Sequence, residues 1–162
     1  MKVFNLFASL LILAFAGVNC KTNSFEDITE PESVYFKVGE SEHVRGDSFI
    51  ISLTDPDHIA HARALIEDPS TITDRIVVAR IVKQTGNEEY LNKDLDKNVV
   101  WSWRVESFES FSFNTIEILD GWPGYIEEDL ERWFLNTSGE TDHGFIGFWN
   151  YTVIAEVSPS SL

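Results

Sequence analysis

Cysteine is nearly absent from this chain of 162 residues, in which Cys20 is the only one. An intramolecular disulfide is therefore impossible, and packing must stabilise the folded part. Basic residues are scarce too: 12 Lys and Arg face 27 Asp and Glu, and the formal net charge is -15. Nucleic acids and anionic membrane surfaces require basic patches, so we expect neither as a partner.

Familiar catalytic and cofactor motifs are also missing. The chain has no nucleophile elbow, phosphate-binding glycine loop, paired-histidine metalloprotease helix or nucleotide-binding fingerprint. Its acidic residues are too numerous for a carboxylate pair suited to glycoside hydrolysis to stand out. We therefore predict no cofactor, and no motif indicates an enzyme class.

What is present begins with an apolar N-terminal segment. Lys2 supplies a short positive region, and residues 3–18 are apolar apart from two polar positions. This pattern is typical of a secretory signal peptide and is too short to span a bilayer as a folded element. We predict an exported protein whose residues 1–20 form the signal.

The position of Cys20 leaves three alternatives for processing. Ala14-Phe15-Ala16 fits ordinary signal cleavage, which would leave Cys20 as a free thiol near the new N-terminus. Residues 17–20 loosely resemble a lipobox, in which Cys20 becomes the lipidated first residue of the mature chain. In the third alternative, Cys20 is removed with the peptide. We favour lipidation slightly, and predict a secreted or lipid-anchored protein at the cell envelope with no other membrane contact.

The remainder divides into a tether and one domain. Residues 21–33 are polar, acidic and aperiodic, as expected for a linker. Residues 34–157 have the length and aromatic content of a single domain with a proper core, and residues 158–162 form a short tail. Asn136 and Asn150 begin N-glycosylation sequons, which matter only if the source is eukaryotic.

Periodicity predicts an α+β domain. Asp55 and Pro56 suit the start of a helix, as its cap and first residue, and Pro69 is expected to end it. A second helix is expected from apolar residues at i, i+4, i+7 and i+8, namely Ile126, Leu130, Trp133 and Phe134. The expected strands lie at residues 34–38, 49–54, 75–82, 99–105 and 111–119, with a strand or hairpin over 144–157 and a long loop over 84–98. Because the element order does not alternate regularly, we expect a single, mostly antiparallel sheet with both helices packed on one face.

Two histidines and an aspartate are the candidates for catalysis. His58 and His61 are spaced i, i+3 on the first expected helix, so their rings can jointly hold a zinc or copper ion or supply a general base. A metal site needs three or four ligands, and without them this pair is a solvated helix flank. Asp120 ends an expected strand in a turn with Gly and Pro, where an aspartate more often bonds the backbone than catalyses.

Three further residues are metal candidates of a different kind. Asn92, Asp94 and Asp96 occupy alternate positions, like the first half of a calcium-binding loop. The glycine and the terminal glutamate of such a loop are missing. We therefore predict no metal, and the three residues stay candidates on an incomplete pattern.

Three tryptophans are the ligand-binding candidates. Trp101 and Trp103 share one face of an expected strand, and Trp122 precedes the second helix. Exposed together, they would form a platform for sugars or apolar groups. Buried, they would be part of the core of a disulfide-free domain, and this is the safer interpretation.

Several blocks of the chain resemble, in the same order, those of one domain family. They are DSFIISLTDP at 47–56 with HIAHARAL at 58–65, IVVARIVK at 76–83, WSW at 101–103, IEILDG at 116–121 and YIEEDL at 125–130. The family is named after the N-terminal domain of a slime-mould calmodulin-binding protein. The resemblance covers roughly residues 34–157.

This resemblance implies a small exported domain with no established catalytic residues. Calmodulin binding belongs to the founding protein, and it is not expected here because the second helix is acidic where a basic one would be needed. Many members carry cysteines where this chain has Leu119 and residues 148–150. Packing would replace here any disulfide that those members form.

Together these observations predict an exported, non-catalytic binding or interaction domain whose partner is an unknown protein or small molecule. One alternative is a small hydrolase or metal-dependent enzyme that uses His58, His61 and Asp120. Another is a secreted inhibitor or effector that presents residues 39–47, which include the adhesion tripeptide Arg45-Gly46-Asp47, or residues 84–98 to a partner.

Overall fold

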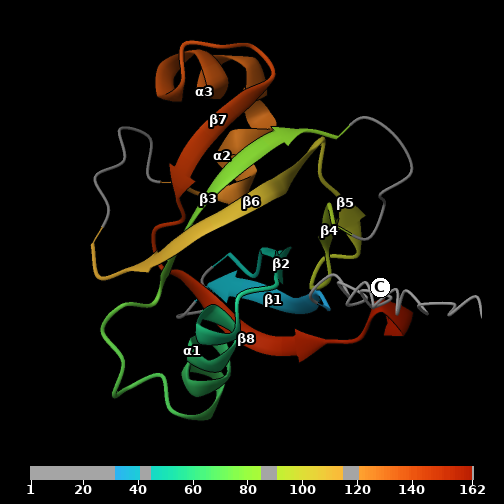
Figure 1. The fold of residues 1–162 in the computed structure, drawn as a ribbon. Helices are drawn as coiled ribbons and strands as arrows, with labels where there is room; N and C mark the ends of the chain where they lie inside the picture. Colours follow the sequence, from blue (N-terminus) through green and yellow to red (C-terminus); the bar gives the residue numbers. More distant parts are fainter. Residues whose placement is uncertain (1–31, 41–44, 85–90, 115–120, 162) are drawn as a thin grey trace, which may run out of the picture. The chain divides into compact units, whose positions relative to one another are not determined.

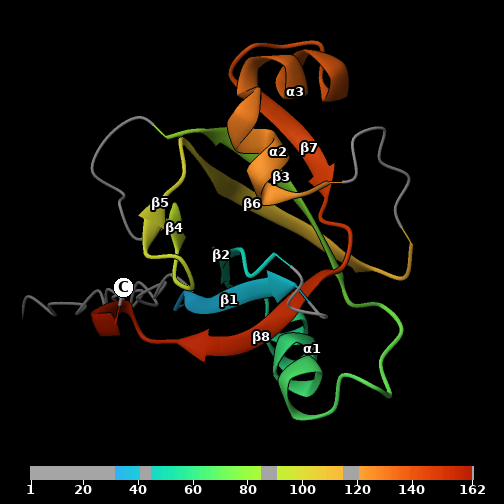
Figure 2. The ribbon, with the colours of Figure 1, turned by 180° about the vertical axis from the view of Figure 1, so that it is seen from behind.

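The computed structural model describes residues 32–40, 45–84, 91–114 and 121–161. The expected signal peptide with Cys20, most of the linker, and Asp120 lie outside these residues. Within them the protein is an α+β domain, as predicted, and the strands pair antiparallel (Figures 1 and 2).

The described strands form three sheets instead of the single sheet expected. Sheet A has the order β2-β1-β8, with β1 at Val34–Glu40, β2 at Ser48–Leu53 and β8 at Tyr151–Val157. Sheet B has the order β6-β3-β7, with β3 at Ile76–Lys83, β6 at Trp103–Ser112 and β7 at His143–Gly147. A two-stranded ribbon pairs β4 (Lys93–Asp94) with β5 (Val99–Val100).

The chain passes from sheet B to sheet A directly after β7. The Tyr151 N–H donates to the Phe148 carbonyl over 2.9 Å, and Asn150 has a φ of 63°, so the connection is a tight turn. β7 pairs with β3, whereas β8 pairs with β1. The segment 144–157 is therefore two strands of different sheets and not a hairpin.

β6 is one strand where sequence alternation predicts parts of two. Two register shifts against β3 leave Glu106 and Glu109 without cross-strand partners, and both side chains are exposed. Each shift is a β-bulge that inserts one residue and so restores the inward face. The residues that pack on the core are consequently spaced two, three and three apart: Trp103, Val105, Phe108 and Phe111.

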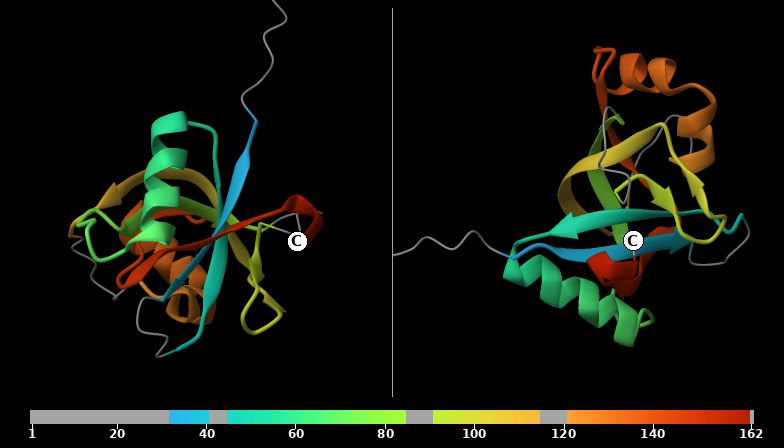
Figure 3. Two further views of the ribbon diagram at one scale, coloured as in Figure 1. Left: turned by 90° about the horizontal axis from the view of Figure 1, so that it is seen from below. Right: turned by 90° about the vertical axis from the view of Figure 1, so that its right-hand side faces the viewer.

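The first helix, α1 (Pro56–Glu67), begins and ends as predicted. The Asp55 carboxylate accepts the backbone N–H of His58 at 3.2 Å and of Asp57 at 2.8 Å, and these bonds lower the pKa of the Asp55 carboxyl. The helix ends two residues before Pro69. It lies against one side of sheet A, with sheet B on the other side (Figure 3).

The second expected helix is divided in two. α2 spans Pro123–Glu128 and α3 spans Leu130–Thr137, because Asp129 has non-helical backbone and caps α3 by accepting the Arg132 N–H at 3.4 Å. α3 contacts β7 of sheet B, whereas α1 contacts β8 of sheet A, so the helices do not share one sheet face. The predicted apolar face is nevertheless buried, with Ile126, Leu130, Trp133 and Phe134 at most 9% exposed.

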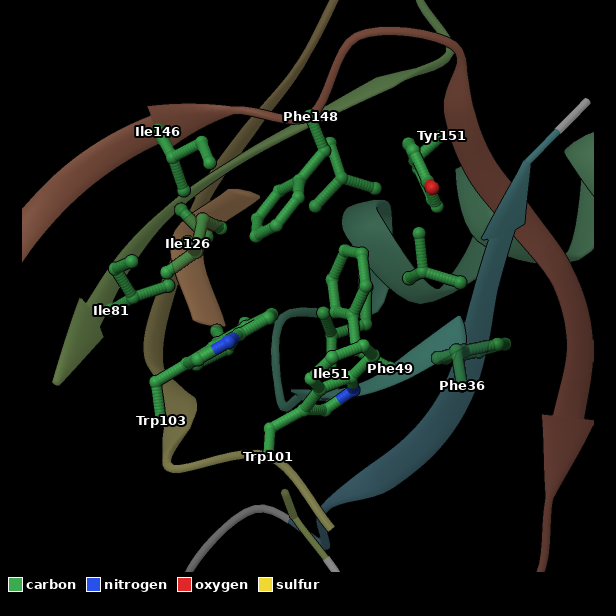
Figure 4. Close-up of a cluster of buried hydrophobic side chains, with 14 of the residues drawn as sticks. Phe36, Phe49, Ile51, Ile81, Trp101, Trp103, Ile126, Ile146, Phe148 and Tyr151 are labelled. Atoms are coloured by element: carbon green, nitrogen blue, oxygen red, sulfur yellow. The ribbon is translucent and has the colours of Figure 1, made fainter. Parts of the chain in front are cut away.

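Aromatic rings from both three-stranded sheets meet in one core (Figure 4). The ring of Phe49 lies 4.1 Å from that of Phe148, 5.8 Å from Trp103 and 6.1 Å from Tyr151, centroid to centroid. Trp101 stacks on Trp103 at 5.7 Å. Buried aromatic area of this kind contributes much of the packing energy that a chain without a disulfide needs.

Candidate binding groove

The two candidate histidines pack against phenyl rings of β6. The His58 ring meets Phe108 edge-on with centroids 5.0 Å apart, and the His61 ring stacks on Phe111 at 4.5 Å. His61 Nε2 also lies 2.6 Å from the Asp74 carbonyl oxygen. In the described part of the chain, no three His, Cys, Asp or Glu side chains gather in a way that could hold a metal ion.

Asp94 is buried and joins the β4–β5 ribbon to the start of β2. Its Oδ1 accepts the Ser48 hydroxyl at 2.8 Å and three backbone N–H groups, those of Ser48, Asp96 and Lys97, at 3.0–3.2 Å. An oxygen that is surrounded by hydrogen-bond donors is not presented to a cation. Asp94 therefore acts as a structural acceptor.

The other two calcium-loop candidates point to different partners. The Asn92 side-chain amide donates to the Trp101 carbonyl at 2.8 Å, and the Asp96 carboxylate pairs with Lys37. The three residues thus hold the ribbon in place and do not converge on one point. We call Ser48, Asn92, Asp94 and Asp96 the polar cluster.

The structure does not bring the three candidate tryptophans to a common surface. Trp101 and Trp103 are 6% and 0% exposed, and Trp101 Nε1 donates to the Ser48 carbonyl at 2.9 Å. Trp122 is half-buried, with the Arg45 guanidinium over its ring and the Tyr125 ring 4.7 Å away. The first two indoles are core residues, as the safer interpretation has it.

The described ends of the two candidate effector loops are tied together. Asp47 is 3% exposed and pairs with Lys97, so the adhesion tripeptide does not present its carboxylate to solvent. Arg45 pairs with Glu40. The remaining parts of these loops, residues 41–44 and 85–90, lie outside the described residues.

Tyr151 lies close to these carboxylates. Its side chain is fully buried, and its hydroxyl has no hydrogen-bond partner among the described residues. Burial raises the pKa of the phenol well above its usual range, and the charges of Asp47 and Glu40 raise it further. Tyr151 therefore remains neutral in the folded protein.

A groove of about 400 Å³ opens between α1 and β8. These two elements lie side by side in Figures 1 and 2. The apolar side chains that line the groove are Leu65, Ile66, Pro69, Val153 and Ile154, and the polar ones are Glu40, Ser70, Arg75 and Thr152. Its size lies within the usual range of small-ligand sites.

A β-bulge shapes the floor of this groove. Lys37 pairs with Ala155 and Val38 with Val153, so Ile154 is the extra residue of β8. Its side chain lies over Gly39, where a Cβ would approach Ile154 Cδ1 to 2.5 Å. The absence of a side chain at Gly39 is therefore what admits Ile154 to this position.

The polar groups of the groove differ in how they are engaged. Glu40 is 2% exposed and accepts the Arg45 backbone N–H at 2.6 Å and its guanidinium at 3.1 Å. The Thr152 hydroxyl is buried without a hydrogen-bond partner among the described residues. Arg75 is exposed, and its guanidinium forms no ion pair with a described residue. The groove therefore offers a free cation and an unused hydroxyl.

A second hollow, of about 600 Å³, lies along α1 near residues 56–64. Its lining includes Arg63, which is already bound by Glu156 through two bonds of 2.8 and 3.1 Å. This pairing lowers the pKa of the Glu156 carboxyl. The hollow consequently has less to offer a ligand than the groove does.

The remaining predicted positions are exposed. Asn136 lies on α3 and Asn150 in the β7–β8 turn, both on the surface. On the outer face of sheet B, Phe145 is 41% exposed and stands under the Arg80 guanidinium at 4.8 Å. This cation–π contact already uses the ring and the charge together.

Sequence reasoning did not find the groove, because its lining comes from segments far apart in the chain. The only local signal is the departure from strict alternation around Ile154, which the strand expectation for 144–157 passed over. Arg75 lies in the α1–β3 connection, where nothing in the sequence distinguishes it from any exposed arginine.

The fold and the groove define an α+β domain with two small antiparallel sheets around an aromatic core. The chain belongs to the domain family named after the N-terminal domain of a slime-mould calmodulin-binding protein; the family match covers residues 32–160 and confirms the resemblance. Neither a curated protein nor a solved structure matches it significantly. Among the described residues, no helix has the length and apolar character needed to cross a membrane.

Proposed function

We propose that this protein is an exported, non-catalytic binding domain that takes a small ligand in the groove between α1 and β8. The observation that carries the proposal is the Thr152 hydroxyl, buried at the groove without a partner among the described residues. An unpaired buried hydroxyl costs free energy that a ligand can recover by supplying the missing hydrogen bond. The apolar walls supply the hydrophobic part of the binding energy.

The non-catalytic part of the proposal rests on how the candidate catalytic groups are used. His58 and His61 pack against Phe108 and Phe111, and neither belongs to the lining of the groove. The export part rests on the apolar segment 3–18, and Cys20 is the proposed lipid-attachment site. Calmodulin is not among the proposed partners.

Chemical-shift mapping of the mature protein with a panel of small fragments tests the binding site. We expect the largest shifts at Ile66, Thr152 and Ile154. A matched pair of variants gives the control, because Ser70 lines the groove and the neighbouring Thr71 does not, while each is exposed and bonds to Asp68. Ser70→Trp should block binding and Thr71→Trp should leave it unchanged; equal effects of both would refute the groove as the site.

Intact-mass measurement of the protein from its producing cells tests the export proposal. We expect the signal to be missing and acyl chains to be attached to Cys20. An N-terminus upstream of Cys20 with a free thiol would remove the lipid anchor and leave export standing. An intact residue 1–20 segment on the mature protein would remove both, and sugar mass on Asn136 or Asn150 would identify a glycosylating host.

A further inference from the structure

We propose that the groove selects an amphiphilic anion, whose apolar body lies against the α1–β8 walls and whose carboxylate is bound by Arg75. This inference rests on the proposed function and adds the chemical class of the ligand. It is argued from the apolar walls, from the charges at the rim and from the ion pairs elsewhere in the described chain.

The walls require an apolar body. Leu65 and Val153 are each 1% exposed and form the deep part, whereas Ile66 and Ile154 are half-buried and keep apolar surface open. Small-ligand sites are mostly apolar, with a few polar groups that orient the ligand. A purely polar ion would leave these walls uncovered and gain nothing from them.

The rim determines the sign of the charge. Two ionisable side chains line the groove, Glu40 and Arg75. The Glu40 carboxylate is buried and already neutralised by Arg45, so it does not attract a second cation. Arg75 has its guanidinium free of ion pairs among the described residues, and a guanidinium matches a carboxylate with two parallel hydrogen bonds. The ligand is therefore expected to be an anion.

Most other cations of the described chain are engaged. Arg63 pairs with Glu156, Lys83 with Glu131 and Lys97 with Asp47, at side chains distant from the groove lining. With a net charge of -15, the molecule repels anions over most of its surface. A free arginine beside an apolar groove is thus a place where this acidic protein can retain an anion.

Three probes with the same eight-carbon chain separate the contributions: sodium octanoate, 1-octanol and octylammonium chloride. Each is titrated into the mature protein and followed by the chemical shifts of Ile66, Thr152 and Ile154. We expect octanoate to bind about fivefold more tightly than octanol, as an exposed charge pair allows, and octylammonium to bind most weakly. Arg75→Gln should remove the preference for octanoate over octanol.

Arg132→Gln is the matched control, because Arg132 is also exposed and forms no ion pair with a described residue but lies on α3, away from the groove. It should keep the preference. If octanol binds wild type as tightly as octanoate, or if Arg75→Gln keeps the preference, the anion assignment is wrong while the binding function stands. If none of the three probes shifts the groove residues, both the assignment and the proposed function are wrong.

Discussion

Polar side chains are buried at two places along sheet A, and the two places differ in how completely those side chains are bonded. In the polar cluster, Asp94 Oδ1 accepts four donors and the Ser48 hydroxyl both donates and accepts. In the groove, the Thr152 hydroxyl has no partner and Arg75 has no ion pair among the described residues. The comparison teaches that the bonded groups stabilise the fold, whereas the unbonded groups beside open space are available to a ligand.

The largest expected effect is at the centre of the polar cluster. Asp94→Ala leaves buried N–H and hydroxyl donors without their acceptor, so we expect the free energy of unfolding to fall by about 3 kcal/mol. Asp94→Asn keeps one oxygen acceptor and should lose about half as much. Urea unfolding measures both. A loss below about 1 kcal/mol for the alanine variant would contradict the structural role of Asp94.

The next effect is that of the hydroxyl bonded to Asp94. Ser48→Ala removes a donor at 2.8 Å from Asp94 and an acceptor at 2.9 Å from the Leu95 N–H. We expect a loss of about 1.5 kcal/mol in the free energy of unfolding. Ser107→Ala, at an exposed hydroxyl of β6, is the control and should change little.

Tyr151 tests the comparison through pH. Its phenol pKa is raised in the folded state, so this group's stability is fully present below about pH 10, the unfolded value, and is lost as the pH rises further. Tyr151→Phe should change the free energy of unfolding by at most about 1 kcal/mol at neutral pH, because the lost hydroxyl has no partner in the described residues.

At alkaline pH the same variant should be less sensitive than wild type, since it has no buried phenol to ionise. Unfolding free energies measured at about pH 8 and about pH 11 show the difference. Tyr125→Phe, at an exposed ring, should follow wild type at both values. Parallel losses in wild type and Tyr151→Phe would mean that Tyr151 is not protected from ionisation.

The smallest expected change in stability has the opposite sign. Thr152→Val replaces an unpartnered buried hydroxyl by a methyl group of similar shape, so the free energy of unfolding should stay equal or rise by up to about 1 kcal/mol. Binding in the groove should weaken at the same time. Because the change also removes the Asn150 sequon, both proteins are produced in a host that does not glycosylate. A loss of stability like that of Ser48→Ala would place Thr152 with the bonded groups.

Local signals predicted the parts of the fold that depend on local chemistry. The α1 start at Asp55 and the buried face around Trp133 are confirmed, because capping and helical periodicity involve neighbouring residues. The continuous strand β6 was missed because bulges at Glu106 and Glu109 break its alternation. The break at Asp129 was missed because that residue lies between two segments of one apolar pattern.

Long-range pairing could not be predicted in the same way. No property of residues 144–157 indicates that β7 joins β3 and β8 joins β1, because strand partners are chosen by the whole fold. The groove depends on that choice, since Thr152 and Ile154 face α1 only when β8 is in sheet A. The sequence therefore indicated residues with conspicuous chemistry, such as His58 and Trp103, and the structure uses these for packing.

Chemical-shift mapping of the mature protein with octanoate tests the central claim most directly, because it reports every part of the chain at once. The account predicts that the largest shifts lie at Ile66, Thr152 and Ile154, while Ser48 and Asp94 of the polar cluster stay unchanged. Largest shifts at the polar cluster, or at Phe145 on the outer face of sheet B, would contradict it.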